Sequence, residues 1–326
     1  MSFSIFVSTT WRGISRAELT GGSWQVSRLL KEQETRSLAS SRDGLILVGT
    51  QGNGVLRSDD AGVSWAPSGL DGMIVKSLAI SPADPRVVYA GTKPPGIFKS
   101  GNGGRDWVEL AEFQKVRKWW WRQPAERPTV AYVSALAPAA ADPDVIVAGI
   151  EAGAVLRTDD GGSSWQGHLK GAARDCHALS FHRSASYVYE GGGGVRKPGA
   201  AISTDAGVTW SRVVRGPDVK YGWAVVGDHA DPETWYVALA PGPMRAHIDG
   251  KAEAYLYRHD AAGWTRLSGG LPQPMKHMVY ALVSDARGLI YAGLASGRIW
   301  HSIDRGESWT EMSLDLGAIH RSLVAL

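Results

Sequence analysis

An eight-residue motif of the form S/T-x-D-x-G-x-x-W recurs along this 326-residue chain at a nearly regular interval. Four copies match the form in full, one has Asn102 in place of the aspartate, and two keep little more than the glycine and the tryptophan. Their tryptophans, in chain order, are Trp24, Trp65, Trp107, Trp165, Trp210, Trp264 and Trp309. Consecutive tryptophans lie 41, 42, 58, 45, 54 and 45 residues apart, close to the interval of about 40–50 residues at which four-stranded units repeat. The chain is therefore expected to contain seven copies of one such unit.

Each repeat is built from four short segments with the character of β-strands. In the third repeat they are 76–80, 87–91, 96–99 and the residues around Trp107. Short apolar runs bounded by Gly, Pro and Asp are typical of strands. The predicted fold is all-β, a seven-bladed β-propeller. The last apolar run, 321–324, matches the first strand of the other repeats, so we expect it to join the first blade as its innermost strand and close the ring, which removes an exposed sheet edge.

The whole chain, 1–326, is expected to form a single propeller domain. The predicted blades are 1–30 together with 319–326, 31–70, 71–112, 130–170, 174–215, 221–268 and 277–315, and the predicted insertions on one face are 113–129 and 240–254.

The repeats resemble the Asp-box (BNR) repeats of sialidases, sortilin-type receptors, xyloglucan-active glycosidases and photosystem II assembly propellers. The segments 149–151, 174–177 and 269–274 are more closely similar to bacterial sialidase-like and WD40/YVTN/BNR-like repeat proteins, a group without an assigned activity. This resemblance covers essentially the whole chain. Sialidases hold a carboxylate with an arginine cluster, but this chain has no F/Y-R-I-P motif, and 11–14 is a poor substitute for it.

The aspartates of the motif are expected to be structural. An aspartate at this position can accept backbone N–H bonds within its own turn, the glycine can take a positive φ, and the tryptophan can pack beneath. The motif should therefore fasten the hairpin between the third and fourth strands of a blade.

The strand order predicts which loops share a face. In a four-stranded antiparallel blade, the second-to-third loops and the connections to the next blade lie at the end opposite the motif turns. Both long insertions fall at that end, and long loops gathered on one face commonly carry function.

The first strands align on Leu38, Leu78, Leu136, Leu179, Val225, Leu282 and Leu323. Two residues earlier stand Arg36, Lys76, Ser134, His177, Trp223, Tyr280 and Arg321, which should surround the mouth of the central channel.

Three of these residues are candidates for holding an anion. Arg36, Lys76 and Arg321 come from consecutive blades, so they would concentrate positive charge in one arc suited to a carboxylate, sulfate or phosphate. The alternative is that they form ion pairs with neighbouring carboxylates, of which the nearest in sequence are Glu32, Glu34 and Asp71.

Glu190 is the candidate catalytic carboxylate, because it stands where other second strands carry Ala or Val. A buried carboxylate needs either a polar cavity or an ion pair. His177 begins the neighbouring strand and Asp175 precedes it by two residues, so the three are predicted as a catalytic group. Burial would raise the pKa of Glu190, and His177 beside it would complete an acid–base pair for proton abstraction or glycosidic cleavage. The alternative is a structural pair.

Aromatic residues complete the predicted substrate site. The run 119–121 is three consecutive tryptophans, of which Trp120 is expected over the mouth, as a stacking surface or an interface anchor. The alternative is packing against the adjacent blade. The full set of predicted substrate-binding residues is Arg36, Lys76, Arg321, Trp120, Trp223, Tyr280, Glu151 and Arg174.

Composition excludes several classes of function. The net charge of +3 gives no electrostatic case for binding nucleic acid or a membrane, and no apolar run approaches the ~20 residues of a membrane helix. A single cysteine, Cys176, and the lack of a secretory signal pattern favour a cytoplasmic protein. No cofactor is predicted. The alternative is a divalent metal held by Asp175, His177 and Glu190, although no established metal-ligand spacing occurs.

Two functions remain from the sequence. The first is a hydrolase or lyase, glycosidase-like, that acts on a small anionic or sugar-like molecule in the mouth of the channel. The second is a non-catalytic scaffold that binds a protein partner, since propellers serve both roles.

Overall fold

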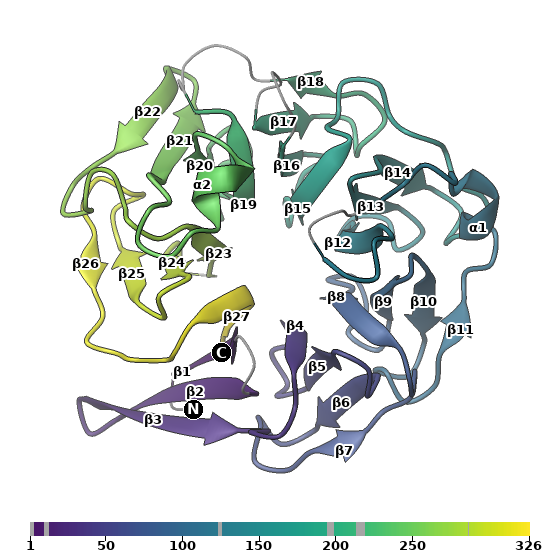
Figure 1. Ribbon diagram of the computed structural model, residues 1–326, viewed down its shortest axis with the longest axis horizontal. Coiled ribbons are helices and arrows are strands. Elements are labelled where there is room, and N and C mark those ends of the chain that lie inside the picture. Colours follow the sequence, from purple (N-terminus) through teal and green to yellow (C-terminus); the bar gives the residue numbers. More distant parts are fainter. Residues whose placement is uncertain (1–2, 10–12, 123–125, 194–198, 213–218, 286) are drawn as a thin grey trace.

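Seven small antiparallel β-sheets surround a common axis in the computed structural model (Figure 1). The structure describes residues 3–9, 13–122, 126–193, 199–212, 219–285 and 287–326. Within this part of the chain, six sheets have four strands and one has three. The predicted all-β, seven-bladed β-propeller is confirmed.

The sheets are numbered as blades in chain order, with the strands of each given from the axis outward. Blade 1 contains β27 (Ile319–Ala325), β1 (Ser4–Thr9), β2 (Ile14–Thr20) and β3 (Ser23–Leu29), and blade 2 contains β4 (Thr35–Ser40), β5 (Ile46–Thr50), β6 (Val55–Ser58) and β7 (Ala66–Pro67). Blade 3 contains β8 (Ile74–Ile80), β9 (Val88–Lys93), β10 (Ile97–Ser100) and β11 (Val108–Glu109), and blade 4 contains β12 (Tyr132–Pro138), β13 (Ile146–Glu151) and β14 (Ala154–Thr158). Blade 5 contains β15 (Asp175–Phe181), β16 (Val188–Gly193), β17 (Ala200–Ser203) and β18 (Ser211–Arg212). Blade 6 contains β19 (Tyr221–Gly227), β20 (Trp235–Ala240), β21 (Tyr255–Asp260) and β22 (Gly263–Leu267), and blade 7 contains β23 (Val279–Ser284), β24 (Ile290–Leu294), β25 (Ile299–Ser302) and β26 (Thr310–Glu311).

Two short helices interrupt this pattern in the part of the chain that the structure describes. Helix α1 (Phe113–Val116) follows β11, and α2 (Pro243–Ala246) lies between β20 and β21. Neither helix is long or apolar enough to cross a membrane, and the described residues contain no other candidate.

The last strand closes the ring, as the sequence predicts. Strand β27 pairs antiparallel with β1, with Phe6 opposite Val324 and Val7 opposite Leu323. Blade 1 therefore combines strands from opposite ends of the described chain, and β27 and β1 lie side by side near the axis in Figure 1.

The recurrent motif forms the turn between the third and fourth strands. At 58–65, the Asp60 carboxylate accepts hydrogen bonds from the backbone N–H groups of Val63 and Ser64, at 3.0 and 2.9 Å. The Gly62 N–H donates to Ser58 Oγ, and Gly62 has a φ of +84° that disfavours a larger residue. The Trp65 indole N–H donates to the Gly62 carbonyl at 3.2 Å. The side chains at 102, 160, 205 and 304 accept backbone N–H bonds in the same way.

A β-bulge interrupts each first strand near the same end of the ring. In blade 3, Val75 pairs with Thr92 and Ser77 with Gly91, so Lys76 is the extra residue. The corresponding shifts in the other blades occur at Arg36, Ser134, His177, Tyr280, the pair Trp223 and Ala224, and the segment around Arg321. A bulge redirects a side chain and often lies beside a functional site. These are the seven positions that simple strand alternation predicts for the mouth of the channel.

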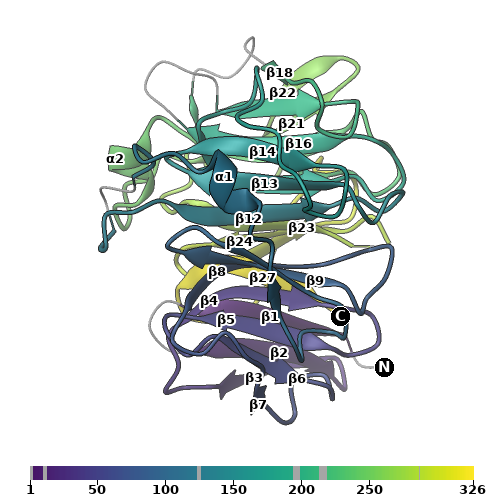
Figure 2. The ribbon, with the colours of Figure 1, turned by 90° about the vertical axis from the view of Figure 1, so that its right-hand side faces the viewer.

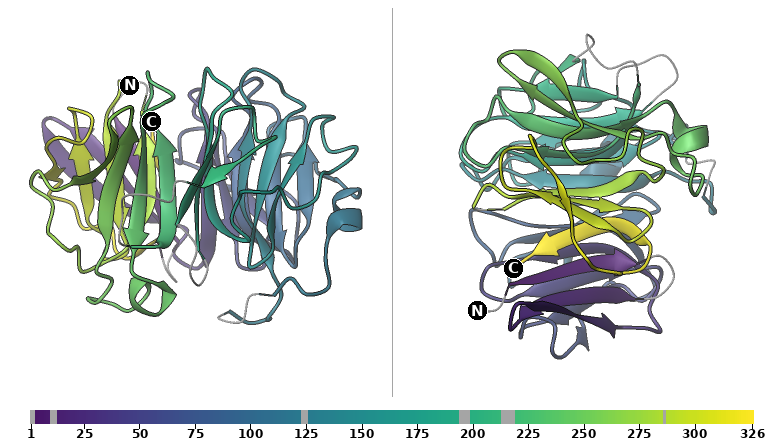
Figure 3. Two further views of the ribbon diagram at one scale, coloured as in Figure 1. Left: turned by 90° about the horizontal axis from the view of Figure 1, so that it is seen from above. Right: turned by 90° about the vertical axis from the view of Figure 1, so that its left-hand side faces the viewer.

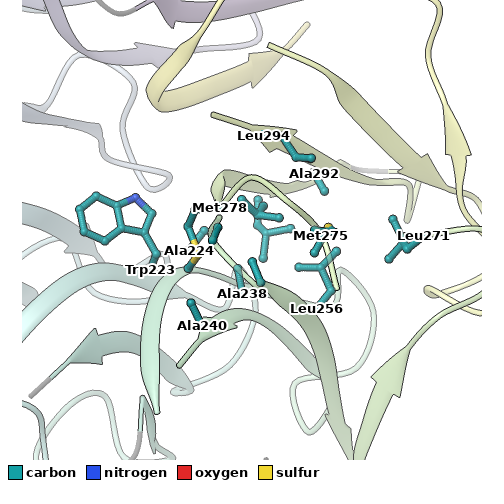
Figure 4. Close-up of a cluster of buried hydrophobic side chains, with 14 of the residues drawn as sticks. Trp223, Ala224, Ala238, Ala240, Leu256, Leu271, Met275, Met278, Ala292 and Leu294 are labelled. Atoms are coloured by element: carbon teal, nitrogen blue, oxygen red, sulfur yellow. The ribbon is translucent and has the colours of Figure 1, made fainter. Parts of the chain in front are cut away.

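Glycine on the second strands lets adjacent blades approach closely. A Cβ atom at Gly149 would lie 2.4 Å from the Sγ of Cys176 in the next blade, and one at Gly91 would lie 2.5 Å from Val133 Cγ1. Between the blades lie separate apolar clusters, of which the largest joins blades 6 and 7. Figure 4 shows Trp223 at the edge of that cluster, with its indole pointing away from Met275 and Leu271.

The described parts of both insertions lie on one face. Figures 2 and 3 show α2 and the segment after α1 projecting from the same side of the ring, and the left view of Figure 3 shows both chain ends on the opposite side. We call the side with the insertions the mouth face.

Candidate functional site

A cavity of about 220 Å³ occupies the central channel. The first strands of all seven blades line it, and its wall includes the whole aligned ring of six leucines and Val225. Six of the seven residues predicted at the mouth also line it: Lys76, Ser134, His177, Trp223, Tyr280 and Arg321. Arg36 is the exception, although its neighbours Ser37 and Leu38 take part. The cavity therefore has an apolar ring along the channel and a polar, aromatic mouth.

Arg321 is held by a buried carboxylate and a tyrosine. Its Nη2 lies 2.5 Å from Glu151 Oε2 and 2.7 Å from the hydroxyl of Tyr132, which itself donates to Glu151. The guanidinium also lies over the indole of Trp223, 4.6 Å from the ring centroid. Burial alone would raise the pKa of Glu151, but Arg321, His177 and the hydrogen bond from Tyr132 together outweigh burial, so the pKa is lowered. Arg321 and Glu151, both predicted site residues, therefore form an ion pair at the end of β13.

Lys76 shares one carboxylate with a second lysine, Lys93, which no sequence motif singles out. Lys76 Nζ lies 2.6 Å from Glu126 Oε1, and Lys93 Nζ lies 3.6 Å from Glu126 Oε2. Both ammonium groups lie over the Tyr132 ring, 4.7 and 5.5 Å from its centroid. Burial lowers the pKa of Lys76 to about 8, against the opposing effect of Glu126. Both lysines are thus desolvated cations with a common anionic partner.

Arg36 pairs with Glu34, one of the partners that the sequence suggests, at 3.4 Å. Its Nε also donates to Gln51 at 2.5 Å, and Nη1 lies 3.1 Å from His320 Nε2. Arg321, Arg36 and Lys76 come from the adjacent strands β27, β4 and β8, so the predicted arc of cations is present. Each member has a carboxylate beside it.

His177 and Asp175 are brought together. His177 Nε2 lies 3.4 Å from Asp175 Oδ2, and its Nδ1 lies 2.6 Å from the Gly222 carbonyl oxygen. Burial opposes the charged imidazolium, but Asp175 and the other nearby acceptors outweigh it, so the pKa of His177 is raised. The ring also contacts Trp223 and Tyr221, with centroids 4.6 and 4.8 Å apart.

Glu190 lies apart from this group. It is fully buried, and both its carboxyl oxygens accept the backbone N–H of Ala173, at 3.1 and 2.9 Å. Burial raises its pKa to about 7, although Ala173 and the thiol of Cys176 favour the charged form. It does not line the cavity, and among the described residues no hydrogen bond joins it to His177. The sequence suggests a polar cavity or an ion pair for this carboxyl, whereas the structure gives it a backbone amide and a thiol.

At the mouth, an imidazole lies between two tyrosine hydroxyls, an arrangement that no sequence motif predicted. His247, from the insertion 240–254, lies between two tyrosines: its Nδ1 is 2.8 Å from Tyr280 Oη, and its Nε2 is 2.8 Å from Tyr221 Oη. Burial lowers the pKa of His247 to about 4, with the charges of His177 and Arg321 acting in the same direction. Neutral His247 therefore accepts from one tyrosine and donates to the other.

Like Arg36 and Glu190, the predicted residues Trp120 and Arg174 do not line the cavity. Trp120 is 50% exposed and packs edge-to-face against Trp119, which is 83% exposed, whereas Trp121 is buried against Phe113. The Arg174 side chain is exposed, and the structure uses its backbone carbonyl, which accepts the Gly153 N–H. Neither Trp120 nor Arg174 lines the wall of the channel.

No group of three His, Cys, Asp or Glu side chains in the described part of the chain is arranged to hold a metal ion. Asp175 and His177 face each other, while Glu190 bonds to Ala173. The described residues thus contain no preformed cluster for the divalent ion considered as an alternative at Asp175, His177 and Glu190.

Solved structures share the propeller fold, and no protein-family model or curated protein matches the chain. The GH74 xyloglucanase from Xanthomonas campestris is 19% identical, with a TM-score of 0.64, over 87% of this chain and 46% of its own. An ancestral GH74 enzyme is 17% identical with the same TM-score, over 85% of this chain and 38% of its own. YCF48 from Cyanidioschyzon merolae is 13% identical with a TM-score of 0.60, over 89% of this chain and 88% of its own. This chain thus spans less than half the length of the GH74 chains, and at these identities the likeness shows the propeller fold alone.

Proposed function

We propose that the protein is a hydrolase or lyase that binds a small, anionic, sugar-like molecule at the mouth of the channel. The observation that carries this proposal is the convergence of Lys76, Arg321, His177, Trp223 and Tyr280 on one cavity, each from the first strand of a different blade. Such a mixture of a few polar groups with aromatic walls is typical of a ligand site. The GH74 neighbours agree with a sugar-like substrate without identifying one.

The cavity offers separate groups for charge and for proton transfer. Lys76 and Arg321 would supply the positive charge of the cavity wall that favours an anionic substrate, and Trp223 would stack on the substrate's ring. Protonated His177, whose pKa is raised, would transfer its Nε2 proton, which faces Asp175 at 3.4 Å, to the leaving oxygen and become neutral. Tyr280 would accept a proton from a substrate carbon or from water while its own hydroxyl proton passes to His247 Nδ1, which lies 2.8 Å away. Elimination and hydrolysis both need this donor–acceptor pair.

Turnover by the purified protein tests the proposal. We would follow unsaturated products and reducing ends with a panel of uronic acids, their oligosaccharides and other sugar acids. Tyr280→Phe should bind the substrate as the wild type does but lose most turnover, by roughly 10²–10⁴-fold, which is the usual contribution of an acid–base group. Tyr255→Phe, on the third strand of blade 6, β21, is the matched control. Absence of both binding and turnover across the panel contradicts the proposal.

The second candidate is a protein-binding platform, which the exposed pair Trp119 and Trp120 favours. Exposed indoles are common anchors of interfaces. One YCF48 structure with this fold is of the protein bound to D1 peptide. A stoichiometric partner that binds the wild type but not a Trp119→Ser, Trp120→Ser variant would support this function. Equal recovery with both proteins would contradict it.

A further inference from the structure

We propose that Lys76 and Lys93 form the seat for the carboxylate of the ligand, and that Glu126 occupies this seat until a ligand displaces it. The inference rests on the proposed function, because it assigns one part of the same site. It adds that the ligand is a carboxylic acid and that binding proceeds by exchange of one carboxylate for another.

The two cations belong to the rigid body of the propeller. Lys76 is on β8 and Lys93 is the last residue of β9, where Ile74 pairs with Lys93 in the ladder. Their side chains are only 2% and 0% exposed. Two ammonium groups buried this deeply need an anion beside them. The pair is therefore a preformed anion site.

The anion comes from a different kind of element. Glu126 lies in the insertion between β11 and β12, and its side chain remains 29% exposed. It contacts the lysines through its carboxylate, and its backbone carbonyl accepts a further bond from Lys93 Nζ at 3.1 Å. The carboxylate is thus the solvent-accessible member of an otherwise buried cluster, so it is the member that a dissolved carboxylate can replace.

The neighbouring carboxylates are committed elsewhere. Glu151 is held by Arg321 and Tyr132, and Glu34 is beside Arg36. The ring of Tyr132 lies beneath both lysines, and its hydroxyl donates to Glu151, the partner of Arg321. The lysine seat and Arg321 therefore form one continuous network. Since Lys76 also lines the cavity, an acid seated there would have the rest of its body at the mouth. Neutral sugars cannot replace Glu126 without leaving two buried cations unpaired.

Thermal unfolding of Glu126→Gln with and without acetate is the first experiment. We expect the variant to unfold at a lower temperature than the wild type, and acetate to restore most of the loss relative to chloride at equal ionic strength. Acetate should change the wild type little, because its own carboxylate occupies the seat. Glu112→Gln, which removes a surface carboxylate paired with exposed Lys115, is the control and should show neither effect.

A double variant completes the test. In Glu126→Gln with Lys93→Met, the rescue by acetate should fall at least tenfold in apparent affinity. If Glu126→Gln folds only in acetate, the inference is supported, and if acetate rescues neither its stability nor its folding, the inference is overturned.

Titration with glucuronate separates this inference from the proposed function. Glucuronate should bind Glu126→Gln at least tenfold more tightly than the wild type. Equal binding by both proteins, without rescue by acetate, overturns the lysine seat and leaves the proposed function standing. Rescue by acetate without binding of any sugar acid supports the lysine seat and contradicts the proposed function.

Discussion

The carboxyl of Glu190 shows how much the environment of a single residue decides its chemistry. It is fully enclosed and bonded to one backbone amide, and burial raises its pKa from 4.5 to about 7. A raised pKa means that the folded protein binds the proton more tightly than the unfolded chain. The protonated form therefore stabilises the fold below pH 4.5, and that contribution is lost as the pH rises through 7.

This linkage predicts the pH dependence of Glu190→Gln. Between pH 4.5 and 8 the wild type should lose about 3 kcal/mol of unfolding free energy relative to the variant, since each unit of pKa shift corresponds to about 1.4 kcal/mol. Denaturant unfolding of both proteins at the two pH values measures the difference. The glutamine amide changes the unfolding free energy equally at both pH values, so its effect cancels in this comparison. Parallel pH profiles of the two proteins would show that Glu190 does not titrate as described.

The pair of His177 and Asp175 makes a separate prediction for activity. If protonated His177 is the proton donor, turnover should fall on the alkaline side as the pH passes its raised pKa. Asp175→Asn removes the partner 3.4 Å away and should move this alkaline limb to lower pH. Asp159→Asn, in a motif turn of the opposite face, should leave it in place. An unmoved limb in Asp175→Asn would exclude His177 as the titrating donor.

At the scale of elements, the sequence predicted the strands and their turns because each is specified locally. The motif turns satisfy their own backbone groups, and the aligned first strands differ from the prediction only in their bulges. Contacts between distant segments were not predictable in this way. Glu126 meets Lys76 across 50 positions, and His247 reaches Tyr221 and Tyr280 from an insertion without a repeat to align it to.

The fit between blades predicts a cost for Gly149→Ala. Its new Cβ would lie 2.4 Å from Cys176 Sγ on the strand that carries His177. Overpacking of this kind costs roughly 1–3 kcal/mol. Gly167→Ala is the matched control, because nothing lies within 4 Å of its Cβ position. Thermal unfolding of the two variants should differ accordingly, and equal midpoints would mean that blades 4 and 5 can move apart at no cost.

At the scale of the whole molecule, the ring depends on one seam between distant segments. Strand β27 is the inner strand of blade 1 and also supplies Arg321, whose partner Glu151 belongs to blade 4. The repeats predicted this closure because the last apolar run matches the other first strands. The ion pair across the channel could not be predicted, because no repeat position links Arg321 to Glu151.

Removal of 319–326 should open this seam. We expect the shortened chain to unfold at a lower temperature and to expose β1 to proteases, because the inner edge of blade 1 loses its partner. A synthetic peptide of 319–326 should restore protection. The same peptide with Arg321→Met should restore β1 less well, since it leaves buried Glu151 unpaired. Unchanged stability of the shortened chain would show that the ring does not rely on β27.

The seam has a thermodynamic consequence for any molecule that binds in the channel. Because β27 forms part of the cavity wall, a ligand that contacts Arg321 binds the closed ring better than the open one. Ligand binding and ring closure are then linked equilibria. At a free ligand concentration [L], a ligand that binds only the closed ring stabilises it by RT ln(1 + [L]/Kd). Hydrogen exchange of the β1 and β27 amides should therefore slow when a ligand occupies the cavity.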